Sequence, residues 1–242
     1  MMLNVAVVNN SGNVGKSTIC ETLLKPRFKK AEVVKVETIN SDGSDDVKYS
    51  ADEFDEILKQ IDATDCSIID VGSSNIENFI LKMKEYKDSH EDIDYFIIPI
   101  IPKNKQQVDS VATAGMLIDM GIEPERIRFI FNQADRKLPI DRQYKEFLSG
   151  IEMFDIKVEN YSVIYETTVF HMLNQLDKTF TEVVNDKRNF RKLLRAEKSR
   201  AKKEEISEMK SVKRLVSGVN DDLDIAFKML NLDLGVEEIA DE

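Results

Sequence analysis

Short apolar runs alternate with longer amphipathic segments along the first 180 residues of the chain. The apolar runs are almost continuously hydrophobic, which is typical of strands buried on both faces of a parallel sheet. They lie at residues 3–9, 32–39, 66–72, 95–101 and 127–133, with a further candidate at 161–165. The segments with helical spacing lie at 16–25, 50–61, 75–89, 107–121 and 167–176. Because parallel strands need long crossover connections, this alternation predicts an α/β fold with a doubly wound, mainly parallel sheet.

The pattern changes at about residue 181. From there to Gly218 the chain has no strand-like run and no proline, and its charge density rises. We expect one long helix over this stretch, followed by a final amphipathic segment at 223–234. The predicted organisation is therefore an α/β domain at residues 1–180 and a charged helical C-terminal extension at residues 181–242.

Composition narrows the class of protein. The 242 residues are 42% hydrophobic and 33% charged, which suits one large α/β domain with an extension. The longest apolar run, at 95–101, is far shorter than the roughly 20 residues that a membrane-spanning helix needs, so we expect no integral membrane segment. The start of the chain lacks the features of a secretory signal, which favours the cytoplasm. Cys20 and Cys66 fall in a predicted helix and a predicted strand, as buried thiols do.

The net charge of −11 is unevenly distributed. Residues 187–214 hold twelve Lys or Arg and four Glu, a local balance of +8, so the rest of the chain carries −19. Several of these cations, from Lys187 to Lys203, follow one another at spacings of three and four, on one flank of a helix. Non-specific contact with DNA, contact with an acidic partner and a simply solvated helix face all remain open.

A phosphate-binding signature follows the first predicted strand. Residues 11–18 read Ser-Gly-Asn-Val-Gly-Lys-Ser-Thr and lead directly into a predicted helix. A glycine-rich turn at a helix N-terminus lets backbone N–H groups and the helix dipole face phosphate oxygens. In such a P-loop, Lys16 would bridge the β- and γ-phosphates and the Ser17 hydroxyl would bind Mg²⁺. The strict motif has glycine at the position of Asn10.

A candidate metal ligand lies about fifty residues downstream, where the apolar strand at 66–70 ends in Asp70. A carboxylate at the carboxyl end of a strand beside the P-loop strand can hold the Mg²⁺ shell of a nucleoside triphosphate, directly or through water. Asp70 is therefore a candidate Walker B residue, acting with Ser17 on the metal.

These motifs resemble the ParA/MinD class of deviant-Walker P-loop ATPases. The phrases SGNVGKST, IIDVG and YFIIPIIPK carry the resemblance, and residues 9–27 (NNSGNVGKSTICETLLKPR) are similar to StbB-type plasmid stability proteins. The resemblance covers about residues 1–175. It implies an ATPase that uses ATP and Mg²⁺, forms a nucleotide-dependent homodimer and acts with a DNA-binding partner protein in plasmid stability, partition, positioning or conjugative transfer. It places the metal at Ser17 and Asp70, and the nucleotide phosphates at Gly12, Asn13, Val14, Gly15, Lys16, Ser17 and Thr18.

Two positions depart from the family pattern. The family has a lysine that reaches the partner's phosphates across the dimer where this chain has Ser11, so the resemblance does not by itself supply that contact. The second strand of ParA proteins ends in Asp-x-Asp, and here Glu37 and Ile39 fall on the two acids. Besides Lys16, the catalytic candidates are therefore Glu37 and Asp42 as the acid that orients water, and slow hydrolysis is expected.

The choice of base depends on residues 131–135, Phe-Asn-Gln-Ala-Asp. In the ParA/MinD class an Asn at this point contacts adenine, and Asn132 matches it. The same segment is one residue away from the Asn-Lys-x-Asp motif of GTPases, in which Asp135 would select guanine. ATP is the favoured nucleotide, because Asp70 is followed by Val-Gly-Ser and does not begin the Asp-x-x-Gly switch of GTPases. GTP is the alternative.

Two functions follow from these residues. The first is a nucleotide-hydrolysing switch, in which ATP and Mg²⁺ order a dimer or a partner surface and hydrolysis releases it. The second is an adaptor with negligible turnover, whose basic helical tail binds DNA or a protein. A metabolic ligase on the same fold is disfavoured, because no second substrate-binding motif is visible in the sequence.

Overall fold

The computed structural model describes residues 3–37, 48–158 and 160–233. These residues form two compact units. One unit comprises Met1–Tyr165 with Ala226–Glu242, and the other comprises Glu166–Ile225. The boundary predicted at residues 180–181 falls within the second unit and stays a prediction.

A seven-stranded, wholly parallel sheet forms the centre of the first unit. Its strand order is β3-β2-β4-β1-β5-β6-β7, which confirms the predicted doubly wound, mainly parallel α/β fold. The strands are β1 (Leu3–Val7), β2 (Glu32–Val36), β3 (Lys48–Tyr49), β4 (Cys66–Val71), β5 (Tyr95–Ile100), β6 (Ile127–Ala134) and β7 (Ser162–Tyr165). The hydrophobic pattern did not predict β3, because a strand of two residues at a sheet edge is too short to show the two-residue alternation of a strand.

The register of the central strands brings the two predicted nucleotide-binding motifs together. β1 pairs with β4 so that Val7 lies opposite Asp70, and it pairs with β5 so that Val7 lies opposite Ile97. Since all strands run in the same direction, the loops after β1 and β4 emerge at the same edge of the sheet.

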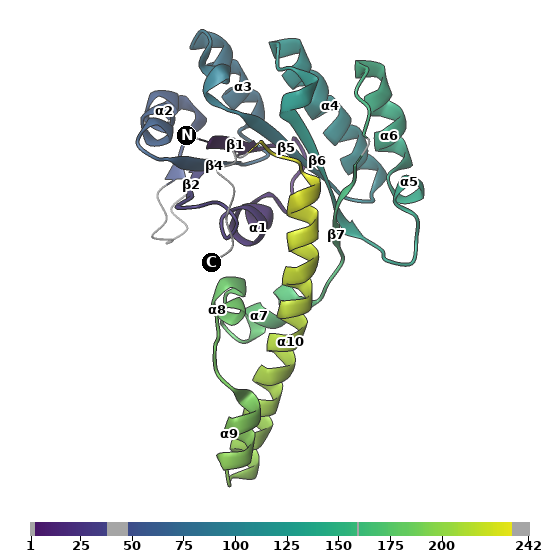
Figure 1. Cartoon of the computed structure of the whole chain (residues 1–242). Coiled ribbons are helices and arrows are strands. Elements are labelled where there is room, and N and C mark those ends of the chain that lie inside the picture. The colour runs from purple at the N-terminus through teal and green to yellow at the C-terminus, as the bar shows by residue number, and fades with distance from the viewer. Residues whose placement is uncertain (1–2, 38–47, 159, 234–242) are drawn as a thin grey trace. The chain divides into compact units, whose positions relative to one another are not determined.

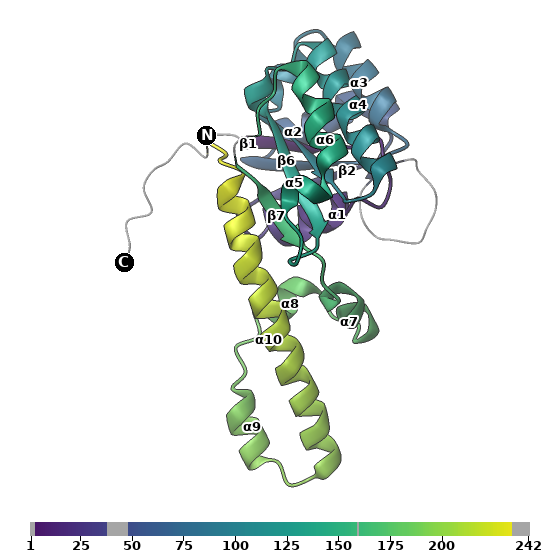
Figure 2. The same cartoon turned by 90° about the vertical axis from the view of Figure 1, so that its right-hand side faces the viewer.

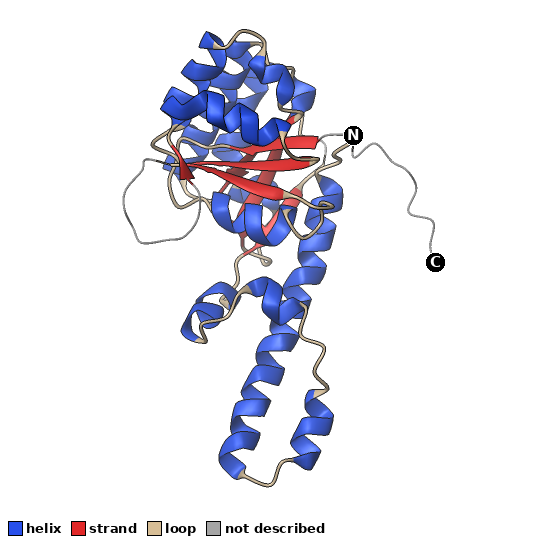
Figure 3. Ribbon diagram, turned by 90° about the vertical axis from the view of Figure 1, so that its left-hand side faces the viewer, coloured by secondary structure: helices blue, strands red, loops and turns tan. Residues whose placement is uncertain are grey.

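Helices cover both faces of this sheet (Figures 1 and 3). One face carries α2 (Phe54–Asp62), α3 (Ile76–Glu85), α4 (Asn104–Met120) and α6 (Lys145–Ile151), whose apolar side chains form the main core with the strands. The other face carries α1 (Lys16–Ile19), which continues as a wider π-type turn over Cys20–Leu24. A short α5 (Ile140–Gln143) precedes α6, and the sequence predicted neither of these two helices. Gly121 ends α4 with a φ of +99°, as a left-handed C-cap.

The second unit is helical. It contains α7 (Val169–Gln175), α8 (Phe180–Val184), α9 (Phe190–Ala196) and α10 (Arg200–Met229), the last of which ends in the first unit. Figure 2 shows α9 beside the beginning of α10, so that these two helices form a hairpin.

The prediction of one continuous helix from residue 181 to Gly218 is wrong. Thr179 and Glu182 form a capping box that begins α8, and the Asn189 side chain accepts from the Lys192 N–H to begin α9. The Glu197 carboxylate then accepts from the backbone of the next two residues and turns the chain into α10. Such side-chain caps satisfy the free N–H groups of a new helix. Gly218 lies inside α10, which continues through most of the predicted final segment.

The last turn of α10 packs within the first unit. The Ser162 hydroxyl donates to the Ala226 carbonyl over 2.7 Å, and the Phe227 ring meets the Phe28 ring edge-on. Arg128 Nε donates to the Leu230 carbonyl over 2.8 Å. The C-terminal end of this helix is therefore anchored to β6 and β7.

Both cysteines are buried free thiols, as predicted. Among the residues that the structure describes, no helix combines the length and the apolar character needed to cross a membrane.

Candidate functional site

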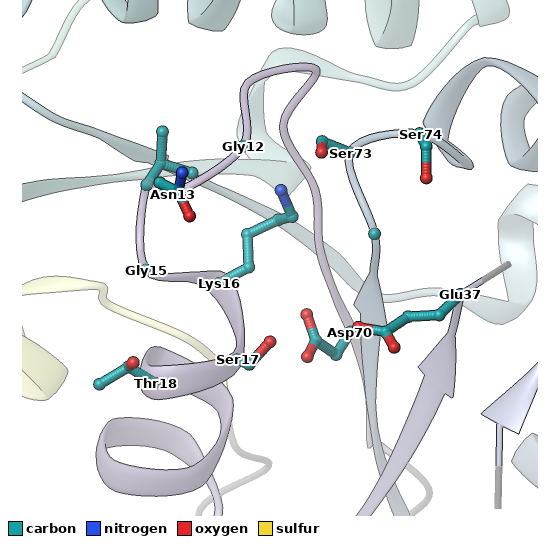
Figure 4. Close-up of a pocket in the computed structure, with 12 residues that line it drawn as sticks. Gly12, Asn13, Gly15, Lys16, Ser17, Thr18, Glu37, Asp70, Ser73 and Ser74 are labelled. Atoms are coloured by element: carbon teal, nitrogen blue, oxygen red, sulfur yellow. The ribbon is translucent and has the colours of Figure 1, made fainter. Parts of the chain in front are cut away.

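A pocket of about 570 Å³ opens at the carboxyl end of the central strands (Figure 4). It lies between the loop that follows β1 and the ends of β2 and β4. Its lining includes the whole predicted phosphate-binding segment together with two predicted acids and a serine-rich turn: Gly12, Asn13, Val14, Gly15, Lys16, Ser17, Thr18, Glu37, Asp70, Gly72, Ser73 and Ser74.

The backbone of the loop explains its glycine at position 15. Gly15 has a φ of +90°, in the left-handed region that glycine adopts without strain. A Cβ at this position would lie 2.5 Å from Asn132 Nδ2. At Gly12, by contrast, a Cβ would meet Ser73 Oγ at an ordinary 3.5 Å. The close approach of β6 to the loop therefore requires glycine at residue 15 and not at residue 12.

Lys16 is the buried cation of the site. Lys16 is the first residue of α1 and is 8% exposed. Its ammonium group donates to the Asn9 carbonyl over 3.1 Å and to the Ser11 carbonyl over 3.0 Å. Burial lowers the pKa of Lys16, and the negative charge of Asp70 opposes this shift. The hydrogen bonds that the structure shows for this ammonium group are to neutral carbonyls, and an anionic partner such as a phosphate would bind it more strongly.

Asp70 and Ser17 form a pair of oxygen-bearing side chains in the site. Asp70 is 3% exposed at the end of β4. Burial raises the pKa of this carboxyl, while a hydrogen bond with the Ser17 side chain and the charge of Lys16 act in the opposite direction. A carboxylate and a hydroxyl side by side offer the oxygen ligands that Mg²⁺ prefers. Among the described residues, no cluster of three or more His, Cys, Asp or Glu could hold a metal, so an ion here would also need phosphate or water oxygens, as Mg²⁺ at a nucleotide site does.

Of the two candidate acids for water activation, the structure describes one. Glu37 lines the pocket just after β2, and its carboxylate lies 3.3 Å from the Lys48 ammonium. Asp42 and Ile39 lie in residues 38–47, outside the described part of the chain.

Asn132 and Asp135, the predicted base-reading residues, are not among the residues that line this pocket. Asn132 is buried and donates from Nδ2 to the Val14 carbonyl over 2.8 Å, so its amide holds the second half of the loop. Asp135 is exposed, and its carboxylate accepts from the backbone N–H of Lys137. Their roles in choosing the base stay predictions.

Sequence reasoning missed the turn after Asp70. Gly72, Ser73 and Ser74 line the pocket, and Figure 4 shows Ser73 and Ser74 across the pocket from the predicted phosphate-binding loop. The signal was available, because this turn directly follows the strand that pairs with β1, at the same edge of the sheet. Its two hydroxyl groups add neutral hydrogen-bonding groups to the site.

Ser11 lies inside the fold. The residue is 5% exposed, and its hydroxyl donates to the Asp109 carboxylate of α4. At this position the ParA/MinD resemblance had placed a lysine that reaches a second protomer. In this chain, the side chain of residue 11 instead forms a hydrogen bond within the same chain.

The basic segment forms the end of the α9–α10 hairpin. Residues 187–203 hold nine Lys or Arg and one Glu, and all nine cationic residues are exposed. Within the described part of the chain, two of them form ion pairs, Arg188 with Asp186 and Arg200 with Glu204. The hairpin therefore carries a dense positive charge, and the described residues pair with two of its nine cations.

No family model and no curated protein matches the sequence. Among solved structures, the cell-division ATPase MinD of Pyrococcus furiosus superposes with a TM-score of 0.52 at 14% identity, over 93% of this chain and 99% of that chain. The chain has the fold of MinD. MinD of Aquifex aeolicus gives a TM-score of 0.51 at 13% identity, over 98% and 100% of the two chains. The same protein in its complex with MinC gives 0.52 at 10% identity, over the same shares. At such identities the likeness to MinD concerns the fold.

Proposed function

We propose that this chain is a nucleotide-dependent switch of the ParA/MinD kind, which binds ATP with Mg²⁺ and hydrolyses it slowly. One observation carries this proposal: the buried Lys16 ammonium and the Asp70–Ser17 pair face a pocket whose wall is a P-loop. GTP is the alternative nucleotide. Asp135 directly follows β6, which ends near the loop, and its carboxylate would select guanine.

Each residue has a distinct task in this proposal. The N–H groups of residues 12–18 cradle the β- and γ-phosphates, and Lys16 turns from the two carbonyls toward the phosphate oxygens. Ser17 and Asp70 hold Mg²⁺, which neutralises phosphate charge when it is bound. Glu37 or Asp42 orients the attacking water. Glu37 is paired with Lys48, and it would have to leave this ion pair to orient a water molecule, which supports slow turnover.

The biological setting follows from the resemblance to ParA and StbB proteins. We propose that the chain acts in the cytoplasm in plasmid stability, partition, positioning or conjugative transfer, as a nucleotide-dependent homodimer with a DNA-binding partner protein. The structure of Aquifex aeolicus MinD with MinC is one instance of this fold with a protein partner.

The test is binding of fluorescent ATP and GTP analogues with Mg²⁺ to the wild type, to Lys16→Ala and to Lys25→Ala. Lys25 follows the same helix but is exposed and paired with Glu21, so it is the matched control. We expect submicromolar to micromolar binding that Lys16→Ala weakens by at least about 100-fold and Lys25→Ala leaves unchanged. If the wild type binds neither nucleotide, the P-loop assignment is wrong.

A second candidate function is supported by the basic hairpin: an adaptor that binds the phosphate backbone of DNA through Lys187–Lys203. Seven of these nine cations lack an ion pair among the described residues, and no exposed aromatic side chain accompanies them, since Phe190 is buried. Such a surface favours sequence-independent phosphate contacts over base stacking.

This adaptor function predicts salt-sensitive binding to duplex DNA. We would neutralise four exposed hairpin cations to Gln, at Arg191, Lys192, Lys202 and Lys203. We would compare this variant with four exposed lysines of the first unit changed to Gln: Lys29, Lys30, Lys84 and Lys105. The hairpin variant should lower the slope of log affinity against log salt by about 2–4, and the control should not. Equal behaviour of the two variants would contradict a DNA site on the hairpin.

A further inference from the structure

The first half of the phosphate-binding loop is fastened to one face of α4. Asn9 Nδ2 donates to Ser110 Oγ over 2.8 Å, and the Asn10 N–H donates to Thr113 Oγ1 over 3.1 Å. The Ser11 hydroxyl donates to the Asp109 carboxylate. Three consecutive loop residues therefore bond to the same face of one helix, about 100 positions away in the sequence.

This contact is partly buried, with Asp109 half-exposed, and it involves the same loop residues that bind the lysine of the site. Asn9, Ser110 and Thr113 are fully buried, and the Ser11 N–H donates to Asn9 Oδ1 over 2.7 Å. The Asn9 and Ser11 carbonyls are the same atoms that accept from the Lys16 ammonium. The Ser11 hydroxyl thus binds to Asp109 of α4, while the Ser11 carbonyl accepts a hydrogen bond from Lys16.

We propose that Asp109 is a positioning residue of the phosphate site. Acting through the Ser11 hydroxyl, it fixes the backbone of residue 11, and with it the position at which the loop continues into Gly12. A loop that is already ordered loses less entropy when it binds a ligand, so this anchor raises affinity without touching the nucleotide. The inference rests on the proposed function, in that the ligand of the loop is a nucleoside triphosphate.

A purely electrostatic role for Asp109 would have the opposite sign. A carboxylate behind the loop repels phosphates, so removing its charge would then tighten binding. Positioning depends instead on a hydrogen-bond acceptor, and Asn keeps such an acceptor without the charge. The comparison of Asp109→Ala with Asp109→Asn therefore separates the two roles.

The experiment is a double-mutant cycle on the full chain with a fluorescent ATP analogue and Mg²⁺. We expect Ser11→Ala and Asp109→Ala each to weaken binding by about 3- to 10-fold, the double variant to be no weaker than the single ones, and Asp109→Asn to stay within about 2-fold of the wild type. Ser89→Ala is the control, because its buried hydroxyl donates to the Met83 carbonyl away from the loop. Tighter binding by either Asp109 variant, or additive losses, would overturn the proposal.

A second readout needs no nucleotide. Hydrogen–deuterium exchange of the peptide that spans residues 9–16 should speed up in Ser11→Ala and Asp109→Ala, and should match the wild type in Asp109→Asn and Ser89→Ala. If the wild type binds no nucleotide, the proposed function fails, and this exchange still decides whether Asp109 orders the loop. Unchanged exchange in Asp109→Ala would refute the positioning role.

Discussion

At the scale of single residues, the site brings a buried cation and a buried carboxylate into one pocket. Burial acts against the charged form of both groups, lowering the pKa of Lys16 and raising the pKa of Asp70. Their mutual attraction offsets these shifts only in part. The nucleotide-free protein therefore holds charges at a cost in stability, which is common where residues are arranged for a ligand.

Asp70→Asn should stabilise the nucleotide-free protein. The pKa of Asp70 is raised above its ordinary 3.8, so the folded protein binds this proton more tightly than the unfolded chain. Stability therefore falls as pH rises through the window between 3.8 and the raised value, and stays reduced above it. This shift already includes the attraction of Lys16. We expect thermal unfolding at pH 7 to show a midpoint about 1–4 °C higher in the variant.

Two controls accompany this prediction. The gain in midpoint should shrink below about pH 4, where the carboxyl is protonated in both states. Binding of nucleotide in the presence of Mg²⁺ should weaken by about 10- to 100-fold. A lower midpoint at pH 7 would show that the Asp70 charge is a net stabilising contact.

Two glycines of the loop should differ in their tolerance of a methyl group. Gly15→Ala combines a left-handed backbone with a Cβ 2.5 Å from Asn132 Nδ2, and should lower the free energy of unfolding by about 1–3 kcal/mol. In Gly12→Ala the nearest atom, Ser73 Oγ, is 3.5 Å away, and the loss should be below about 1 kcal/mol. Denaturant unfolding of the nucleotide-free variants measures both. Equal losses would mean that β6 yields to the added methyl.

At the scale of elements, the two units are joined by α10, whose last turn is fixed against the sheet. Arg128 makes two contacts in this attachment: its guanidinium donates to the Leu230 carbonyl over 2.8 Å and lies over the Tyr95 ring, 5.0 Å from the ring centroid. The Asp233 N–H also donates to the Tyr95 hydroxyl. Carbonyls at a helix C-terminus lack intrahelical partners, so a cation here satisfies them and complements the helix dipole.

Arg128→Ala should lower the free energy of unfolding by about 1–2 kcal/mol, because it removes these bonds and the ring contact. Thermal unfolding should show a midpoint lower by about 2–8 °C. Arg142→Ala, which changes an exposed arginine on α5, serves as the control and should leave the midpoint unchanged. If Arg128→Ala behaves like Arg142→Ala, the attachment of α10 depends on its other contacts, such as those of Ser162 and Phe28.

At the scale of the whole molecule, the proposed DNA-binding segment is positively charged, and the rest of the chain, which contains the proposed nucleotide site, is negatively charged. The +8 of residues 187–214 lies in the second unit, and the −19 of the remaining residues includes the whole proposed nucleotide site. A polyanion is therefore attracted to the hairpin and repelled by most of the other surface, apart from the loop that holds Lys16.

The proposed switch predicts a change in mass. Light scattering should give 27.7 kDa without nucleotide and about twice that with a non-hydrolysable ATP analogue and Mg²⁺. Because the Ser11 side chain is bound to Asp109 in its own protomer, Ser11→Ala should still dimerise at saturating nucleotide. Nucleotide binding with no change in mass would contradict the dimer and favour the adaptor.

Several features of the site could be predicted because their signals are local. The apolar runs predicted the strands, and the Gly-Lys-Ser-Thr phrase at residues 15–18 predicted a loop that precedes a helix. Asp70 was found because a strand end and a carboxylate are adjacent in sequence.

The breaks between α8, α9 and α10 were not predicted, although capping residues such as Asn189 are also local signals. The charged sequence around these residues is compatible with a continuous helix.

The sequence by itself determined the fold class, the glycine-containing loop before α1 and the concentration of positive charge, because backbone geometry and hydrophobic period depend on neighbouring residues. Only the tertiary structure decided that Ser11 bonds to Asp109, that Asn132 holds Val14, and that Ser73 faces the loop. These contacts join residues up to 118 positions apart. Their existence depends on strand order and register, which bring distant side chains together and which no local pattern specifies.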